Sequence, residues 1–84
     1  MRDVTVYTAD PCRLCHLAKT LLEARGVSYQ EVNLTKDPDG RAELVRKTGL
    51  MTFPQIVIDD EPLGGLTELR AADSDGRLHE LLVA

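Results

Sequence analysis

The chain has 84 residues, 43% of them hydrophobic and 29% charged, which is the composition of an ordinary globular protein. This length allows one small domain over residues 1–84 and excludes two independent hydrophobic cores. Ten Lys and Arg against fourteen Asp and Glu give a net charge of −4, which argues against a nucleic-acid partner because binding to phosphates depends on basic side chains.

We expect no export signal at the start of the chain. Met1-Arg2-Asp3-Val4 lacks the apolar segment of a secretory leader, and the acidic Asp3 is atypical of a transit peptide. No apolar stretch approaches the roughly 20 residues that a membrane-crossing helix needs. We therefore expect a cytoplasmic protein without membrane contacts.

The first part of the chain predicts a strand followed by a helix. Residues 4–8 alternate and are rich in β-branched and aromatic side chains, which favours a strand. After Pro11, apolar residues recur from Leu14 to Leu22 at the spacing of one helical stripe. Gly26 is expected to end this helix, because glycine readily adopts the left-handed backbone found there.

Residues 29–34 predict a second strand, and a second helix follows it. Asp37 suits the N-cap of this helix, and Pro38 suits its first turn. Gly49 is expected to end the helix, with residues 44–45 facing the core.

The last third of the chain predicts a hairpin and a final helix. Residues 54–58 favour a buried strand, and polar residues join them to a short antiparallel strand at Leu63-Gly64. Helical spacing resumes at Thr67, and residues 73–76 interrupt it with a bend. The predicted fold is therefore α/β, a four-stranded mixed sheet flanked by three helices, with the first two strands parallel through a right-handed crossover.

Cys12 and Cys15 lie at the predicted start of the first helix, separated by Arg13 and Leu14. In a reducing cytosol, so close a pair is more often catalytic or metal-binding than structural. The backbone N–H groups and the dipole at the helix start favour a thiolate, so we expect a lowered pKa for Cys12, about 3.5–7.5. Cys12 would then attack a substrate disulfide, and Cys15 would resolve the mixed disulfide.

Three other uses of the cysteine pair fit the sequence less well. With His16, the pair matches the Cys-x-x-Cys-His pattern of haem attachment, but the predicted strands do not suit the helical proteins that carry it. A structural zinc site needs four ligands, and the only histidines, His16 and His79, are scattered. The two cysteines could also be ordinary buried residues.

Over essentially its whole length the chain resembles the glutaredoxin branch of the thioredoxin-fold superfamily. The resemblance rests on residues 6–8, the segment from Cys12 to Lys19, the run Thr52-Phe53-Pro54-Gln55-Ile56, and Gly64-Gly65. Cys-x-x-Cys, Thr-x-Pro and Gly-Gly in this order are more specific than the cysteine pair alone. The resemblance implies a thioredoxin fold and a thiol–disulfide oxidoreductase.

The resemblance also implies a peptide-binding segment, Thr52 to Pro54. It implies that the peptide bond before Pro54 is cis and that this proline packs opposite the cysteines. The backbone N–H and C=O of Phe53 would then be free to pair with an extended thiol peptide.

Two further sites are implied for glutathione. The start of the last helix, at Gly65, Leu66 and Thr67, would bind the γ-glutamyl carboxylate. Arg41 on the second helix would meet the glycyl carboxylate.

The sequence departs from the family at positions that bind glutathione. Arg13 and Leu14 stand where Pro-Tyr is common, so an aromatic flank of the substrate is lost while Arg13 adds a positive charge. Ala9 replaces a basic residue, and Thr67 replaces an acidic one. We therefore expect no carboxylate at this helix start to pair with the ammonium group of glutathione.

Together these patterns predict a cytoplasmic, monomeric oxidoreductase that reduces protein disulfides or glutathione mixed disulfides. Glutathione would be its co-substrate, and no cofactor or metal would be bound permanently. One alternative is a redoxin recharged by a flavoprotein similar to thioredoxin reductase. A second alternative is a dimer that binds a [2Fe–2S] cluster through Cys12 and glutathione.

Overall fold

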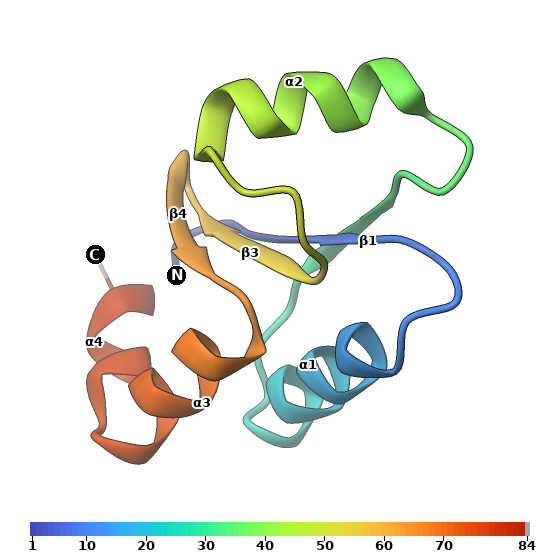
Figure 1. The fold of residues 1–84 in the computed structure, drawn as a ribbon. Coiled ribbons are helices and arrows are strands. Elements are labelled where there is room, and N and C mark those ends of the chain that lie inside the picture. The colour runs from blue at the N-terminus through green and yellow to red at the C-terminus, as the bar shows by residue number, and fades with distance from the viewer. Residues whose placement is uncertain (84) are drawn as a thin grey trace.

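The computed structural model describes residues 1–83, which form a sheet with helices on both faces (Figure 1). In chain order the elements are β1 (Val4–Thr8), α1 (Arg13–Ala24), β2 (Gln30–Asn33), α2 (Pro38–Thr48), β3 (Gln55–Ile58), β4 (Glu61–Gly64), α3 (Leu66–Ser74) and α4 (Arg77–Leu82). The predicted α/β class and element order are confirmed.

The sheet has four strands in the order β2-β1-β3-β4. β1 pairs in parallel with β2 and antiparallel with β3, and β3 and β4 form a hairpin. Helix α2 covers one face of this sheet, and α1 and α3 cover the other (Figure 1). The predicted mixed sheet is therefore confirmed, including its parallel first pair.

The expected number of helices is wrong in one respect, because the last helical stretch consists of two helices. α3 ends at Ser74, Gly76 has a φ of 81°, and α4 begins at Arg77. A left-handed φ of this kind suits glycine, which has no Cβ to clash. The bend predicted at residues 73–76 is thus present, and it divides the helix.

The helix boundaries follow local capping signals in the sequence. The Asp37 side chain accepts a hydrogen bond from the Gly40 N–H at 2.8 Å and caps α2, with Pro38 in the first turn. The same helix ends at the C-cap Gly49. Helix α1 ends at Ala24, two residues before Gly26. The predicted N-cap and end of α2 are confirmed, whereas the C-cap of α1 is Arg25 and Gly26 follows it with a left-handed φ of 69°.

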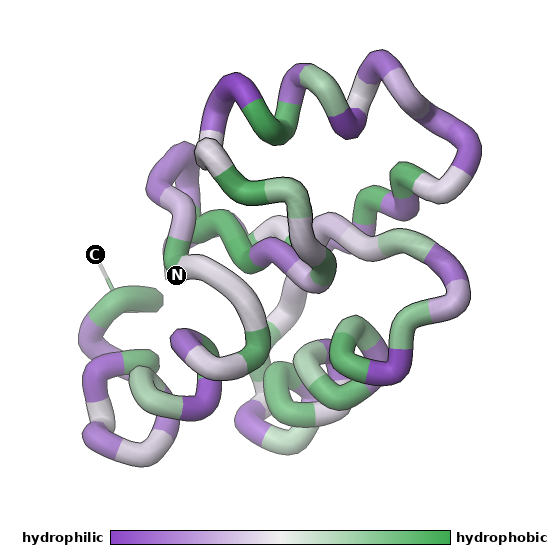
Figure 2. Tube along the Cα trace, viewed as in Figure 1, coloured by the Kyte–Doolittle hydropathy of each residue, from purple (hydrophilic) through white to green (hydrophobic). Residues whose placement is uncertain are grey.

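The hydrophobic core lies between the sheet and helices α1, α3 and α4. Its buried members are Val4, Val6, Ala18, Leu22, Val27, Ile56, Ile58, Leu66, Leu69, Ala72, Leu78 and Leu82. Helix α1 presents a continuous apolar side, whereas α2 is mostly hydrophilic (Figure 2). Leu44 is the residue that α2 buries, and Val45 beside it is only partly buried. Helix α2 therefore lies outside the main core.

None of the helices within residues 1–83 is both long and apolar enough to span a membrane.

An ion pair connects the end of α1 to α3. Arg25 donates hydrogen bonds from Nε and Nη2 to the Asp73 carboxylate at 2.7 and 2.9 Å. The guanidinium lowers the pKa of Asp73 below 3.8, its ordinary value. The pair therefore stabilises the fold above that value, and this contribution is lost as the pH falls through the lowered pKa of the folded state.

We expect Asp73→Asn to lower the urea midpoint at pH 7, modestly because Arg25 is exposed. Since the wild type loses the same interaction in acid, the difference between the two proteins should shrink as the pH falls below 3.8. Urea titrations at several pH values would measure this difference. Glu61→Gln, which changes an exposed carboxylate on β4, is the control. A pH-independent difference for Asp73→Asn would contradict the expectation.

Candidate active site

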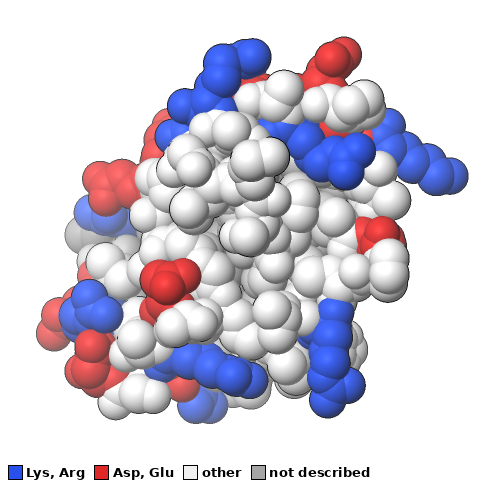
Figure 3. Space-filling view, viewed as in Figure 1, with Lys and Arg blue, Asp and Glu red and all other residues white. Residues whose placement is uncertain are grey.

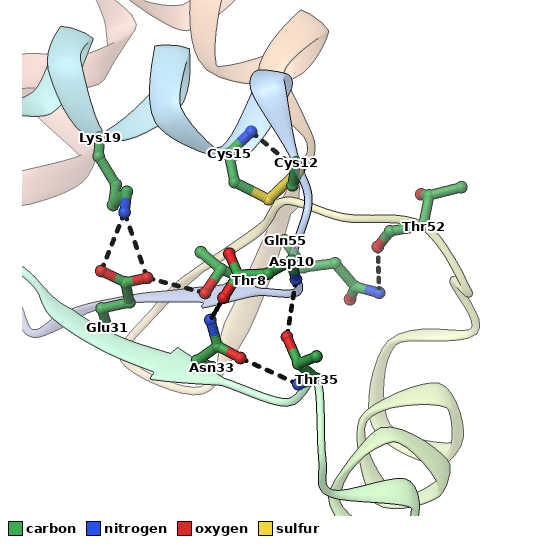
Figure 4. The surroundings of a disulfide bond; sticks show 10 residues. All are labelled: Thr8, Asp10, Cys12, Cys15, Lys19, Glu31, Asn33, Thr35, Thr52 and Gln55. Carbon is green, nitrogen blue, oxygen red and sulfur yellow. Dashed lines mark hydrogen bonds and ion pairs between the residues drawn. A yellow bond between two sulfur atoms is a disulfide. The ribbon is translucent and has the colours of Figure 1, made fainter.

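The two cysteines form a disulfide at the N-terminus of α1 (Figure 4). Cys12 is the N-cap residue, and its Sγ accepts a hydrogen bond from the backbone N–H of Cys15 at 3.1 Å. Cys12 is partly exposed, whereas Cys15 is only 3% exposed. Arg13 and Leu14 between them are exposed. The pair thus has an outer and an inner sulfur, as predicted.

Polar side chains anchor the loop that precedes Cys12. The Asp10 N–H donates to Thr35 Oγ1 at 2.7 Å, and Asn33 Nδ2 donates to Asp10 Oδ2 at 2.8 Å. Asn33 Oδ1 in turn accepts the Thr35 N–H at 3.0 Å (Figure 4). The loop before Cys12 is therefore tied to the segment that follows β2. Sequence reasoning did not identify these residues, which have no distinctive local pattern.

A second polar cluster fixes α1 above the sheet. Glu31 on β2 accepts a hydrogen bond from the Thr8 hydroxyl at 2.8 Å and pairs with Lys19 of α1 at 3.1 Å (Figure 4). Thr8 is 1% exposed, so its hydroxyl needs such a partner. On the same side of the molecule, partial burial and a hydrogen bond to Glu23 raise the pKa of Tyr29 to about 12.

The chain between Thr52 and Gln55 passes the disulfide in the view of Figure 4. The peptide bond before Pro54 is cis, as the resemblance implied, and so is the bond before Pro11, which was not anticipated. Within residues 1–83, no backbone hydrogen bond outside the helices and strands involves Phe53. Its N–H and C=O therefore have no backbone partner of that kind.

Gln55 supports this segment from the first position of β3. Its Nε2 donates to the carbonyl oxygens of Leu50 and Thr52, each at 3.0 Å. Gln55 is 2% exposed, and its Oε1 is buried without a hydrogen-bond partner among the described residues. Gln55 was part of the motif but was not singled out as a site residue.

The start of α3 lies against the same segment. A Cβ added to the N-cap residue Gly65 would lie 3.3 Å from the Pro54 carbonyl oxygen. Leu66 and Thr67 follow in the first turn, where backbone N–H groups have no partner within the helix. Leu66 is buried and Thr67 is exposed.

A carboxylate does lie at this helix start, although it belongs to Glu68 and not to position 67. Glu68 Oε1 accepts the Gly65 N–H at 2.7 Å, so the carboxylate folds back over the first turn. Gly64 makes room for it: its φ is 127°, and a Cβ there would approach the Glu68 Cγ to 2.6 Å. A glutamate three residues after an N-cap is a recognisable capping signal, and it could have identified Glu68 from the sequence.

Arg41 and Phe53 line one pocket of about 350 Å³ between α2 and the segment before β3. On the face shown in Figure 3, charged side chains lie over α2 and towards the lower edge, and a broad uncharged area separates them. A larger pocket of about 910 Å³ is lined by residues such as Met1, Tyr29 and Lys47 and by neither cysteine. The smaller pocket is not lined by a cysteine either, but it shares Phe53 and Gln55 with the segment around Pro54.

Among residues 1–83, no three His, Cys, Asp or Glu side chains are grouped so that they could hold a metal ion.

Comparison with known proteins gives one consistent result. A family model described as Glutaredoxin matches residues 4–63. Glutaredoxin 3 of Escherichia coli (strain K12) is 42% identical over 82 residues, covering 98% of this chain and 99% of that protein. The solution structure of glutaredoxin from Brucella melitensis matches with a TM-score of 0.86 at 39% identity, covering 98% of this chain and 89% of that one. The crystal structure of a buckwheat glutaredoxin–glutathione complex matches with a TM-score of 0.87 at 28% identity, covering 96% and 76%.

Proposed function

Because this chain belongs to the glutaredoxin family and is a thiol–disulfide oxidoreductase with a thioredoxin fold, we propose that Cys12 and Cys15 reduce protein disulfides and glutathione mixed disulfides with electrons from glutathione. One observation carries the assignment of the two roles. The outer sulfur is the N-cap of α1 and the inner sulfur is buried one turn further along. A thiolate at the N-cap is favoured by the backbone N–H groups of the first turn and by the helix dipole.

The reaction is two successive thiol–disulfide exchanges. In the dithiol form, the Cys12 thiolate attacks one substrate sulfur, forms a new S–S bond and releases the other substrate sulfur as a thiolate. Cys15 then gives up its proton to solvent and attacks Cys12 Sγ, which releases the second substrate thiolate and leaves the Cys12–Cys15 disulfide. Two glutathione molecules restore the dithiol and become glutathione disulfide, so two electrons pass from glutathione to the substrate.

The substrate peptide would lie along Thr52, Phe53 and Pro54. The unpaired backbone of Phe53 supports this placement, because it can form the hydrogen bonds of a short added strand. Arg13 and Leu14 would flank the opposite side of the peptide, since both side chains are exposed beside Cys12.

Glutathione would bind at its two ends. The N–H groups of Leu66 and Thr67, next to Gly65, suit the γ-glutamyl carboxylate, and Glu68 offers a carboxylate to the neighbouring ammonium group. Arg41 suits the glycyl carboxylate because it shares a pocket with Phe53. The glutathione complex of the buckwheat relative supports glutathione as a ligand.

We expect Arg41→Ala to raise the KM for glutathione roughly three- to tenfold and to change kcat little, since a charged hydrogen bond at an exposed site is lost. Arg46→Ala is the matched control, because Arg46 is an exposed arginine of the same helix that pairs with Glu43. Steady-state reduction of a small glutathione mixed disulfide would measure both variants. Equal KM values in Arg41→Ala and Arg46→Ala would remove Arg41 from the glutathione site.

The electron donor is identified by measuring which reducing system sustains turnover. NADPH oxidation that requires both glutathione and glutathione reductase supports the proposal. Turnover with a thioredoxin-reductase-like flavoprotein alone would favour the alternative redoxin. The proposal includes a monomer, which sedimentation would measure, and a cytoplasmic location, where the glutathione pool is reducing.

A further inference from the structure

We propose that Asn33 is a positioning residue for the nucleophile, because it holds the carboxylate of Asp10 away from the N-terminus of α1 and so keeps Cys12 ionised. Asn33 acts through Asp10 and is not itself a catalytic residue. Because Cys12 is the nucleophile under the proposed function, this role of Asn33 rests on that function and deepens it.

Three hydrogen bonds fix Asp10 in the loop between β1 and α1. Asn33 Nδ2 donates to Asp10 Oδ2 at 2.8 Å, and the Asp10 N–H donates to Thr35 Oγ1 at 2.7 Å. The Thr35 N–H donates to Asn33 Oδ1 at 3.0 Å, which orients the Asn33 amide, since its oxygen must face that donor and its nitrogen then faces Asp10. In the view of Figure 4, Asp10 lies between the cysteines and these two partners. The Asp10 carboxylate is therefore bound to the end of β2.

The N-terminus of α1 would otherwise attract the Asp10 carboxylate. The first backbone N–H groups of a helix have no partner within it, and the helix dipole places partial positive charge there. A carboxylate is among the preferred acceptors at this position, whereas sulfur is a weak one. Asp10 precedes the N-cap Cys12 by two positions, so their Cα atoms are at most about 7.6 Å apart. Once released, the carboxylate can reach the groups that stabilise the Cys12 sulfur.

A carboxylate beside Cys12 would oppose its ionisation. Two negative charges at one site disfavour each other, so a released Asp10 would raise the pKa of the Cys12 thiol. It would also compete for N–H groups such as that of Cys15, which donates to Cys12 Sγ at 3.1 Å. Both effects reduce the fraction of thiolate, which is the form that attacks a disulfide.

The other charged groups around Cys12 do not oppose the thiolate in this way. Those on α1, on β2 and the segment after it, and at the start of α3 are Arg13, His16, Lys19, Glu31, Lys36 and Glu68. The four basic ones favour a thiolate when they are charged. Glu31 pairs with Lys19 at 3.1 Å, and the Glu68 carboxylate accepts the Gly65 N–H at 2.7 Å. Asp10 is thus the carboxylate nearest to Cys12 in the sequence, and Asn33 determines where it lies.

Alkylation of the reduced protein tests this role, because iodoacetamide reacts with a thiolate and Cys12 is the more exposed cysteine. We expect Asn33→Ala to raise the midpoint of the profile of rate against pH by about one unit, so that the rate below the midpoint falls about tenfold. Gln30→Ala changes an exposed amide on the same strand, and this matched control should keep the wild-type profile. A wild-type profile in Asn33→Ala would overturn the proposal.

Removing the charge of Asp10 separates a positioning role from a merely structural one. Asp10→Asn keeps the backbone N–H that binds Thr35 and a side-chain oxygen to which Asn33 can donate, and its midpoint should be no higher than that of the wild type. Adding Asn33→Ala to Asp10→Asn should then leave the midpoint unchanged, because no carboxylate is released. If Asn33→Ala raised the midpoint equally with and without the Asp10 charge, a loosened loop would explain the rise, and the proposal would be overturned.

Activity distinguishes failure of this role from failure of the proposed function. In Asn33→Ala, kcat/KM for a small glutathione mixed disulfide should fall in acid together with the alkylation rate and return towards the wild-type value as the pH rises. Alkylation needs no glutathione, so it tests the role of Asn33 whatever the electron donor is. Failure of the wild type to reduce the mixed disulfide would instead contradict the proposed function.

Discussion

Replacing Cys12 with serine is expected to abolish reduction of both protein disulfides and glutathione mixed disulfides, by roughly a thousandfold or more. A serine hydroxyl does not ionise near neutral pH, so the N-terminus of α1 has no thiolate to stabilise and no S–S bond can form. Cys15→Ser should behave differently. It should keep activity on glutathione mixed disulfides, which need one thiol, and lose most of its activity on protein disulfides, which need a resolving thiol.

Two measurements separate these outcomes. Glutathione-dependent reduction of a small mixed disulfide reports the one-thiol reaction, and reduction of a disulfide-bonded protein reports the two-thiol reaction. Mass spectrometry of Cys15→Ser should find one glutathione on Cys12, because nothing inside the protein displaces it. Cys15→Ser and Cys12→Ser are matched, since each removes one sulfur and the same disulfide. If Cys12→Ser kept full activity, the outer sulfur would not be the nucleophile.

Those parts of the fold that depend on local signals could be predicted from the sequence. Asp37 and Gly49 mark the two ends of α2 because capping chemistry involves residues only a few positions apart. The alternation of residues 4–8 places Val4 and Val6 in the core. The cysteine pair is also local, so its position at a helix start followed from the stripe beginning at Leu14.

The parts of the site that join distant segments could not be predicted in this way. The contact between Asp10 and Asn33 connects the loop after β1 to the end of β2, which the parallel pairing of these two strands brings together. The pocket between α2 and the segment before β3 is lined by Arg41 and Phe53, which lie twelve positions apart in the sequence. Neither residue carries a pattern that points to the other. The contact between Glu68 and Gly65 is different, because the two residues are only three positions apart and match a capping pattern that the sequence contains.

The packing of α1 predicts the largest effect on stability. Leu22 is 0% exposed and belongs to the core between α1 and the sheet. Leu22→Ala should lower the free energy of unfolding by about 3 kcal/mol, because it removes buried methyl groups and leaves a cavity. That is a large share of the roughly 5–15 kcal/mol that holds a small domain folded. Urea denaturation of the oxidised proteins would measure it.

Leu14→Ala is the matched control for this loss, because the same substitution is made in the same helix. Leu14 is 50% exposed, so we expect its replacement to cost less than about 0.5 kcal/mol. Leucine and alanine are both good helix formers, so helix propensity contributes little to the loss of stability in either variant. The difference between the two losses therefore measures burial. Leu14 would instead affect the KM for substrates, since it lies beside Cys12. Equal losses of stability at Leu14 and Leu22 would contradict the packing of α1 against the sheet.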